Sequence, residues 1–538
     1  MPLGFQAHPV IGRMIGSHSF LLSLAIPIAL SAFTHLWNPI GFPFLQPDES
    51  TYMRRTMYVL EGLGPQESTN DYNKQYDHPY FGQLFLASVL GMIRYPDSLS
   101  PTDDGNTHSI GMLFIVPRIL MGILAVADTF FIYKIAERRY NRTVAFIASI
   151  LFAVMPITWL LRRIFLDNLL LPFLLSSILF AVYIKKPSED TISGDKNNKE
   201  RLPLVIISGI FLGLAIFTKI PAFAFIPVVG FLIFTNTNRS LKALSLWFIP
   251  IILIPSIWPA LAISTGEFNY WLDGVTIQAT REGGTLIDSL NSFFKMDPVL
   301  ILLGIVGTVF AIIRKDYLVL LWMAPYLLFL HIINFVSIIH LVMLLPPFSV
   351  AAARLISELS SKINNIKIRR ILPFIITSGF SIFALLSITM LITTNLNSYY
   401  FEVYAFIVKH LPSYDNKTNS NNKATTLIGR YWAKSFYWIP QYVFQKELDF
   451  ISDDKLKLYM SKNELPIKND KLLLIVDNIM LRYILKNNKD TVIGQYYNNT
   501  YPVAKFEDNT IHYDTSSYPY TSLHGPTIPR KIEIRANY

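Results

Sequence analysis

The sequence predicts a polytopic α-helical membrane protein with a small α/β domain after its last membrane span. Of the 538 residues, 52% are hydrophobic and only 16% are charged, whereas soluble globular domains carry about 25% charged residues. Apolar runs that suit a bilayer recur as far as about residue 395, and a polar composition follows. We therefore divide the chain into a transmembrane domain, 1–395, and a soluble domain, 396–538.

The apolar runs predict about eleven transmembrane helices. The first run resembles a signal peptide in one respect, a cleavage-like Ala29-Leu30-Ser31, but its apolar residues continue to Trp37. The predicted spans are 20–37, 110–136, 144–160, 164–183, 204–217, 222–234, 244–263, 299–313, 318–334, 336–353 and 371–392.

Basic residues gather in alternate loops, which predicts the orientation. With the N-terminus in the cytoplasm, the inside loops contain Lys134, Arg138, Arg139, Arg142, Lys185, Lys186, Lys196, Lys199, Arg201, Arg239, Lys242, Arg314, Lys315, Arg354, Lys362, Lys367, Arg369 and Arg370. The short outside loops are poorer in basic residues. We expect loops 38–108 and 266–297 and the C-terminal domain to be extracytoplasmic, in the plasma membrane of a prokaryote.

Two function classes are excluded by composition. The net charge of +10 lies in these loop clusters and forms no basic stripe, so we expect no nucleic-acid partner. Because the chain has no cysteine, it has no disulfide, thiolate metal site or cysteine nucleophile.

Beyond residue 396 the chain is rich in Asn, Lys, Asp and Tyr. Short apolar runs at 424–428, 472–476 and 491–493 are separated by helix-like stretches at 455–462 and 478–485. Strands that alternate with helices predict a small α/β domain. We expect this domain to have an accessory role.

Two adjacent carboxylates, Asp48 and Glu49, open the first outside loop, and Tyr52 follows one helical turn later. A low-dielectric membrane boundary raises the pKa and the basicity of a carboxylate, and a general base needs such tuning. The structural alternative is a helix N-terminus with Asp48 as its cap and Glu49 in its first turn. The same loop contains His78-Pro79, which predicts a turn onto a further helix at the membrane surface.

Further ionisable residues lie in or beside the predicted spans, where such residues are functional candidates. Arg118 is near the outside end of its span and suits a phosphate, because its guanidinium binds two oxygens at once. Asp128 is deeper in the same span, where we expect a structural pairing. Arg163 and Asp167 lie at the outside boundary, and the structural alternative is a salt bridge between them at i, i+4.

Lys219 is a lone lysine in a short outside loop, where it binds a lipid phosphate or, alternatively, snorkels to lipid headgroups. Six of the candidates fall on one face of the membrane: Asp48, Glu49, His78, Arg118, Asp167 and Lys219. Carboxylates and cations on one face describe an active site for an anionic substrate.

These residues resemble the GT-C glycosyltransferases, especially their protein O-mannosyltransferase and aminoarabinose-transferase branch. The resemblance covers about residues 18–350 and rests on Asp48-Glu49, on His78-Pro79 with Gly82, on Arg118, and on Arg163 through Asp167; Thr218-Lys219 and Leu345-Pro346-Pro347 fit more loosely. In that family two prolines and Gly-Lys often follow the histidine, whereas Tyr80 and Gln83 stand in those places here.

The resemblance implies that Asp48 is the base that activates the acceptor, with Glu49 in support, and that Arg118 contacts the lipid phosphate. Lys219 and Arg163 are further candidates for the phosphate, Asp167 is a second carboxylate that orients the acceptor or the base, and His78 and Tyr52 belong to the substrate loop. No cofactor is required, no metal ligands are assigned, and a divalent cation remains an option.

Topology restricts the donor independently of the resemblance. Nucleotide sugars are cytoplasmic, so an outside active site needs a sugar that is already carried across on a lipid, as in a polyprenyl-phosphate sugar. We expect a single displacement that inverts the anomeric carbon, onto a hydroxyl of a protein, lipid or glycan acceptor. The alternative from another class is a transporter or flippase of lipid-linked sugars, but transporters place ionisable residues near the midplane and have repeat-related halves.

Overall fold

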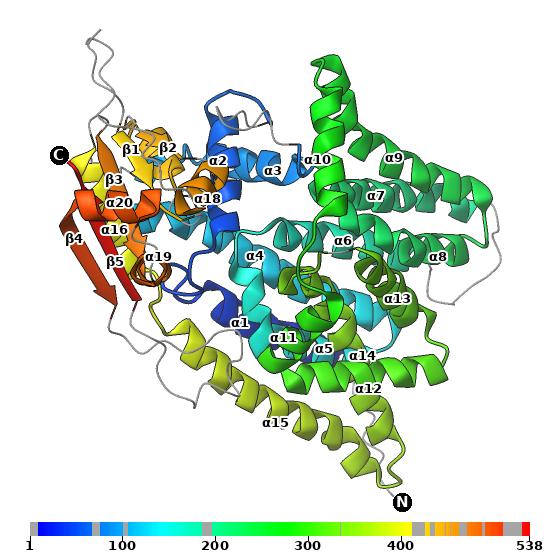
Figure 1. Ribbon diagram of the computed structural model, residues 1–538. Coiled ribbons are helices and arrows are strands. Elements are labelled where there is room, and N and C mark those ends of the chain that lie inside the picture. The colour runs from blue at the N-terminus through cyan, green and yellow to red at the C-terminus, as the bar shows by residue number, and fades with distance from the viewer. Residues whose placement is uncertain are drawn as a thin grey trace, which may run out of the picture.

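The computed structural model describes residues 9–66, 76–99, 106–184, 196–333, 335–411, 425–430, 436–446, 448–451, 453–461, 471–486, 490–508 and 530–538. Its larger part is a bundle of apolar helices (Figure 1). Every predicted span overlaps at least one of them. They are α1 (Pro9–Leu36), α4 (Thr107–Arg139), α5 (Arg142–Val154), α6 (Leu166–Tyr183), α7 (Lys196–Thr218), α8 (Ile226–Asn236), α9 (Leu241–Ser264), α12 (Pro298–Ile313), α13 (Tyr317–Ile332), α14 (Leu345–Ser361) and α15 (Ile366–Ile392).

In the described residues, five helices are long and apolar enough to cross a membrane, and up to seven if two bent pairs each form one span. The predicted number of eleven therefore stays a prediction. Several spans are interrupted near one end by a 3₁₀ segment: η2 (Pro156–Arg162), η3 (Ile220–Phe225) and η4 (Ile338–Leu344). The first two have a proline at their beginning, where its missing N–H interrupts the helical hydrogen bonds.

The predicted outside loops form further helices. The first loop contains α2 (Pro47–Leu60), α3 (Phe81–Met92) and η1 (Asp97–Leu99), and the loop after α9 contains α10 (Phe268–Thr280) and α11 (Leu286–Met296). The turn predicted at His78-Pro79 is confirmed, because α3 begins three residues after the histidine.

The C-terminal residues form a five-stranded sheet with the order β2-β1-β3-β5-β4. Strand β1 (Thr425–Ile428) is parallel to β2 (Leu448–Phe450) and β3 (Leu472–Asp477), whereas β5 (Arg530–Ala536) is antiparallel to β3 and to β4 (Tyr501–Asp508). The helices of this part are α16 (Ser398–His410), α18 (Asp453–Ser461), α19 (Asn478–Leu485) and α20 (Val492–Asn499), with η5 (Ile439–Val443) between β1 and β2.

The apolar runs at β1 and β3 are strands, and the two helix-like stretches are α18 and α19, as predicted. The strand predicted for the third run, 491–493, is wrong, because these residues begin α20. Its Thr491 hydroxyl accepts a hydrogen bond from Gly494 N–H, at 3.3 Å, and caps α20.

One apolar cluster joins the sheet to the helical part. The ring of Phe114 in α4 contacts the rings of Phe401 in α16 and of Phe436 and Trp438 before β2, and α2 contributes Met53 and Met57 to the same cluster. Figure 1 accordingly shows the sheet beside α2 at one end of the bundle. The predicted domain boundary at 395/396 falls in the turn between α15 and α16.

Candidate active site

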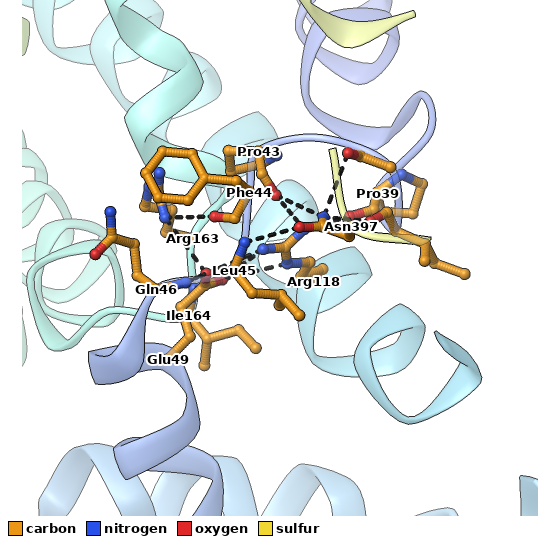
Figure 2. A network of polar contacts seen from close by, with 12 residues as sticks. Pro39, Pro43, Phe44, Leu45, Gln46, Glu49, Arg118, Arg163, Ile164 and Asn397 are labelled. Carbon is orange, nitrogen blue, oxygen red and sulfur yellow. Dashed lines mark hydrogen bonds and ion pairs between the residues drawn. The ribbon is translucent and has the colours of Figure 1, made fainter. Parts of the chain in front are cut away.

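The segment before α2 is held by a residue from far along the chain. Buried Asn397, the N-cap of α16, donates from Nδ2 to the carbonyls of Ile40 (2.6 Å) and Pro43 (2.9 Å) and accepts from Leu45 N–H (2.8 Å). Figure 2 shows the contacts of Asn397 with Pro43 and Leu45. The start of α2 therefore has a fixed position before any substrate binds.

Glu49 lies at the centre of a buried network (Figure 2). One carboxylate oxygen accepts from Gln46 N–H at 3.0 Å, which closes a capping box at the start of α2. The other accepts from Ile164 N–H at 3.2 Å. Arg118 donates to both oxygens from Nη2 at 3.0 and 3.1 Å, and Arg163 lies 3.4 Å from one of them. The carboxylate thus ties α2 to α4 and to the start of α6.

All five N–H groups of Arg118 are engaged by the protein. Nε and Nη2 donate to Glu49, and the two N–H groups of Nη1 donate to the carbonyls of Pro39 (2.9 Å) and Pro43 (2.8 Å). The side chain is 1% exposed. The expected contact of Arg118 with a lipid phosphate stays a prediction, and this arrangement favours a role in supporting Glu49.

Asp48 has the opposite environment. It is exposed although its neighbour is fully buried, and within the described part of the chain its carboxylate makes no hydrogen bond or ion pair. Protein atoms nevertheless surround it on most sides. Burial raises the pKa of Asp48, and so does Asp167, whereas Lys219, Arg281 and Arg163 act against that increase. The predicted alternative, Asp48 as the helix cap, is wrong: Gln46 is the N-cap.

Lys219 and Asp167 form a buried ion pair, with Nζ and Oδ2 2.7 Å apart. The pair joins the end of α7 to the first turn of α6. Lys219 is 6% exposed, so it does not snorkel to headgroups. The predicted salt bridge between Asp167 and Arg163 is also wrong, because Arg163 turns to Glu49 and to the carbonyl of Phe44 at 2.8 Å.

Arg163 combines aromatic packing with unused donors. Its guanidinium lies over the rings of Phe44, Trp159 and Phe165, at 4.6, 4.9 and 5.7 Å from their centroids. Only Nη1 has hydrogen-bond partners among the described residues. Nε and Nη2 remain as donors, and the guanidinium acts electrostatically on Asp48.

Tyr52 and His78 lie close enough to Asp167 to interact electrostatically with it. Burial and the charge of Asp48 raise the pKa of Tyr52, so its phenol stays protonated. Burial lowers the pKa of His78 to about 4 against the opposite effect of Asp77, with Lys219 adding to the decrease. His78 is therefore neutral near pH 7.

The position of His78 is set by its neighbours in the loop. Arg55 of α2 forms a 2.8 Å ion pair with Asp77, and the hydroxyl of Tyr76 donates to Glu267 at 2.6 Å. The predicted site residues of this loop are thus fastened to α2 on one side and to the turn before α10 on the other.

Two ionisable residues of this region were not identified from the sequence. Arg281, between α10 and α11, acts electrostatically on Asp48, and His340 in η4 is within electrostatic range of Lys219, Asp167 and His78. Arg281 lies in the predicted outside loop 266–297, and His340 lies inside an apolar run. The sequence signal for both is an ionisable residue at an outside boundary.

Asp128 lies apart from these residues. It is 1% exposed, and neither of its carboxylate oxygens has a hydrogen-bond partner in the part of the chain that the structure describes. The structural pairing expected for it is therefore wrong. A search of the described residues finds no group of three or more His, Asp or Glu side chains that could hold a metal ion.

Comparisons with known proteins agree with this architecture. The family model for dolichyl-phosphate-mannose-protein mannosyltransferase matches residues 110–263, which contain Arg118, Arg163, Asp167 and Lys219. No curated protein matches.

Solved structures match nearly the whole chain. ArnT from Cupriavidus metallidurans bound to undecaprenyl phosphate matches with a TM-score of 0.55 and 12% identity over 97% of this chain and 98% of that one. The apo oligosaccharyltransferase from Archaeoglobus fulgidus has a TM-score of 0.57 and 12% identity, over 95% and 75% of the two chains. AglB from the same organism, in complex with an inhibitory peptide and a dolichol-phosphate, has a TM-score of 0.54, 12% identity and coverage of 96% and 75%. The chain is thus a membrane protein with the fold of the GT-C glycosyltransferase superfamily, as its sequence predicts.

Proposed function

We propose that this protein transfers a sugar from a polyprenyl-phosphate donor to an acceptor hydroxyl at the extracytoplasmic face of the membrane, with inversion at the anomeric carbon. One observation carries the proposal: the accessible Asp48 carboxylate has no hydrogen-bond or ion-pair partner among the described residues, and the cations Lys219, Arg281 and Arg163 act on it from three other segments. A free base beside cations suits a reaction in which a hydroxyl is deprotonated and a phosphate departs.

Asp48 acts as the general base in this scheme. Its raised pKa makes it a stronger base than an ordinary aspartate. The acceptor oxygen forms the new bond to the anomeric carbon and loses its proton to Asp48. The bond between that carbon and the phosphate oxygen breaks, and the electron pair leaves with the lipid phosphate.

Lys219, Arg281 and Arg163 stabilise the charge that develops on the departing phosphate. Lys219 uses one N–H for Asp167 and an ammonium has three, so two are available. Arg281 is exposed, and Arg163 retains its Nε and Nη2. Arg118 has no unused N–H, so we assign it, together with Glu49, to holding α2 and thereby Asp48 in place.

The remaining candidates have supporting roles. Asp167 fixes Lys219 through their 2.7 Å contact. Tyr52 is one turn from Asp48 on the same helix and offers a protonated hydroxyl, and neutral His78 offers a hydrogen bond without adding charge. No metal is needed, and both oxygens of Glu49 already accept hydrogen bonds from the protein.

The donor class is supported by topology and by the relatives. An extracytoplasmic site needs a lipid-carried sugar, and two structures with this fold contain undecaprenyl phosphate and a dolichol-phosphate. The family model of protein mannosyltransferases favours a protein hydroxyl, on Ser or Thr, as acceptor. A lipid or glycan acceptor is the alternative, and a flippase of lipid-linked sugars is the alternative of another class.

The test is transfer of radiolabelled sugar from polyprenyl-phosphate donors by the purified protein, with donor binding measured in parallel. We expect Asp48→Asn to bind the donor and to lose transfer by two orders of magnitude or more, about the range for removing a general base. Glu61→Gln, which changes an exposed carboxylate at the other end of α2, is the matched control and should retain transfer. Wild-type protein that moves lipid-linked sugar between leaflets without transferring it would support the flippase alternative.

A further inference from the structure

Segment 335–340, at the beginning of η4, is fastened to the linker between α10 and α11. Val336 N–H donates to the Gly284 carbonyl at 2.7 Å, and the Ser289 hydroxyl donates to the Val336 carbonyl at 2.8 Å. Gly283 packs closely against Phe335, because a Cβ on Gly283 would lie 2.2 Å from Cδ2 of that ring. The two segments therefore form one packed unit.

This unit carries Arg281 and His340 together. The guanidinium of Arg281 lies 3.9 Å from the ring centroid of Phe335. The same ring packs edge-on against the imidazole of His340, with centroids 6.1 Å apart and an interplanar angle of 83°. Arg281, which binds the donor phosphate in the proposed function, and the imidazole of His340 thus pack on the same ring.

The tautomer of His340 follows from its hydrogen bonds. Ser337 N–H donates to Nδ1 at 3.1 Å, as part of the capping box of η4. A nitrogen that accepts a hydrogen bond carries no proton, so the proton is on Nε2 and the ring is neutral. The Tyr326 hydroxyl donates to the His340 carbonyl at 2.7 Å and holds the backbone there.

The Nε2–H group has no hydrogen-bond partner among the described residues. The His340 side chain as a whole is 8% exposed. Its Nε2 atom is not one of the fully buried polar atoms that lack a hydrogen-bond partner, so Nε2 itself remains accessible. The charged groups that act on the ring are Lys219, Asp167 and Arg281, and His78 lies in the same range. A neutral N–H donor beside two cations suits an oxygen atom that carries negative charge.

We propose that His340 binds the lipid-linked donor by donating a hydrogen bond from Nε2–H to an oxygen of its phosphate. The inference rests on the proposed function, in which Lys219 and Arg281 bind that phosphate. His340 then supplies the directional contact that the two cations lack: as a neutral donor fixed by its backbone hydrogen bond, it defines where a phosphate oxygen must lie.

Two amide variants separate the two ring nitrogens. His340→Asn keeps an atom near the position of Nδ1 that accepts from Ser337 N–H, but it lacks the Nε2–H group. His340→Gln places an N–H near the position of Nε2 and loses the acceptor. We expect the Kd of the purified full-length protein for undecaprenyl phosphate to rise about tenfold or more in His340→Asn, the usual effect of losing a hydrogen bond to a charged group. The same assay with His340→Gln should give a Kd much closer to that of the wild type.

Undecaprenol, which has the lipid chain without the phosphate, is the second probe, and its binding should not change in either variant. Thermal unfolding without ligand reports whether each variant is folded. Unchanged undecaprenyl phosphate binding in His340→Asn overturns the inference. Equal losses in both variants also overturn it, because the N–H that His340→Gln places near the position of Nε2 would then restore no binding. If His340→Asn alone weakens binding but the wild type transfers no sugar, the proposed function fails and the phosphate contact stands.

Discussion

Asp48 and Glu49 are adjacent in the chain, yet their carboxylates have different tasks. Glu49 is fully buried and accepts hydrogen bonds from α2, α4 and the start of α6, whereas Asp48 is exposed and has no partner among the described residues. Consecutive helical positions point about 100° apart, so one side chain faces the bundle while the next faces the site. The pair therefore provides an anchor and, in the proposed function, a reactive group in two consecutive residues.

This difference predicts that substitutions of the two residues have unequal effects on stability. Glu49→Gln leaves Arg118 and Arg163 without their buried counter-charge, and removing one partner of a buried ion pair costs about 3–5 kcal/mol. Asp48→Asn removes no hydrogen bond within the described residues, so its unfolding free energy should change little. Thermal or denaturant unfolding of both purified variants checks this, and an equal loss in the two variants would contradict the assignment of Glu49 as the anchor.

The pH dependence of transfer follows from the environment of Asp48. The base works only when it is deprotonated, so activity is lost as the pH falls through its pKa. Because the pKa of Asp48 is raised by burial, the acid limb of kcat/KM should lie above about pH 4, the ordinary value for an aspartate.

Lys219→Met removes a positive charge that opposes this increase, so it should move the acid limb to still higher pH. The quantity compared between the wild type and Lys219→Met is the pH at the midpoint of the acid limb. This pH does not depend on the lower overall rate of the variant. A limb that stays in place or moves to lower pH would show that another group titrates.

At the scale of the elements, α3 packs closely against α6 at a glycine. A Cβ on Gly82 would lie 2.4 Å from Cδ2 of Leu166, the residue just before Asp167. We expect Gly82→Val to push α3 and α6 apart, to cost about 1–3 kcal/mol of stability through overpacking, and to lower transfer by displacing the Asp167–Lys219 pair. Gly91→Ala in the same helix is the control, since its Cβ would come no closer than 3.3 Å to Leu60. Equal transfer by the two variants would contradict this role for the contact.

The elements also show which parts of the fold and of the candidate site can be predicted from the sequence. Apolar length located the apolar helices of the bundle, and His78-Pro79 located the start of α3, because both signals are local. The partner of Asp167 was not local: Lys219 is 52 positions away, and the i, i+4 rule instead pointed to Arg163. Arg281 and His340 were missed because their place in the site depends on packing between the α10–α11 linker and η4.

At the scale of the whole molecule, the predicted orientation places α2 outside and the α12–α13 turn inside. The absence of cysteine makes this directly testable with single-cysteine variants at two exposed positions, Glu61 and Lys315. In intact cells, a membrane-impermeant maleimide should label Glu61→Cys but should label Lys315→Cys only after permeabilisation. The reverse pattern would invert the topology and remove the argument for a lipid-linked donor.

The hydrogen bonds of Asn397 have a consequence for the order in which the protein is made. Residues 40–45, which lead into α2, are held by a side chain that the ribosome adds about 350 residues later. Early spans enter the membrane while this anchor is still missing, so we expect the start of α2 to reach its final position only after α15 has been inserted and the chain behind it has emerged.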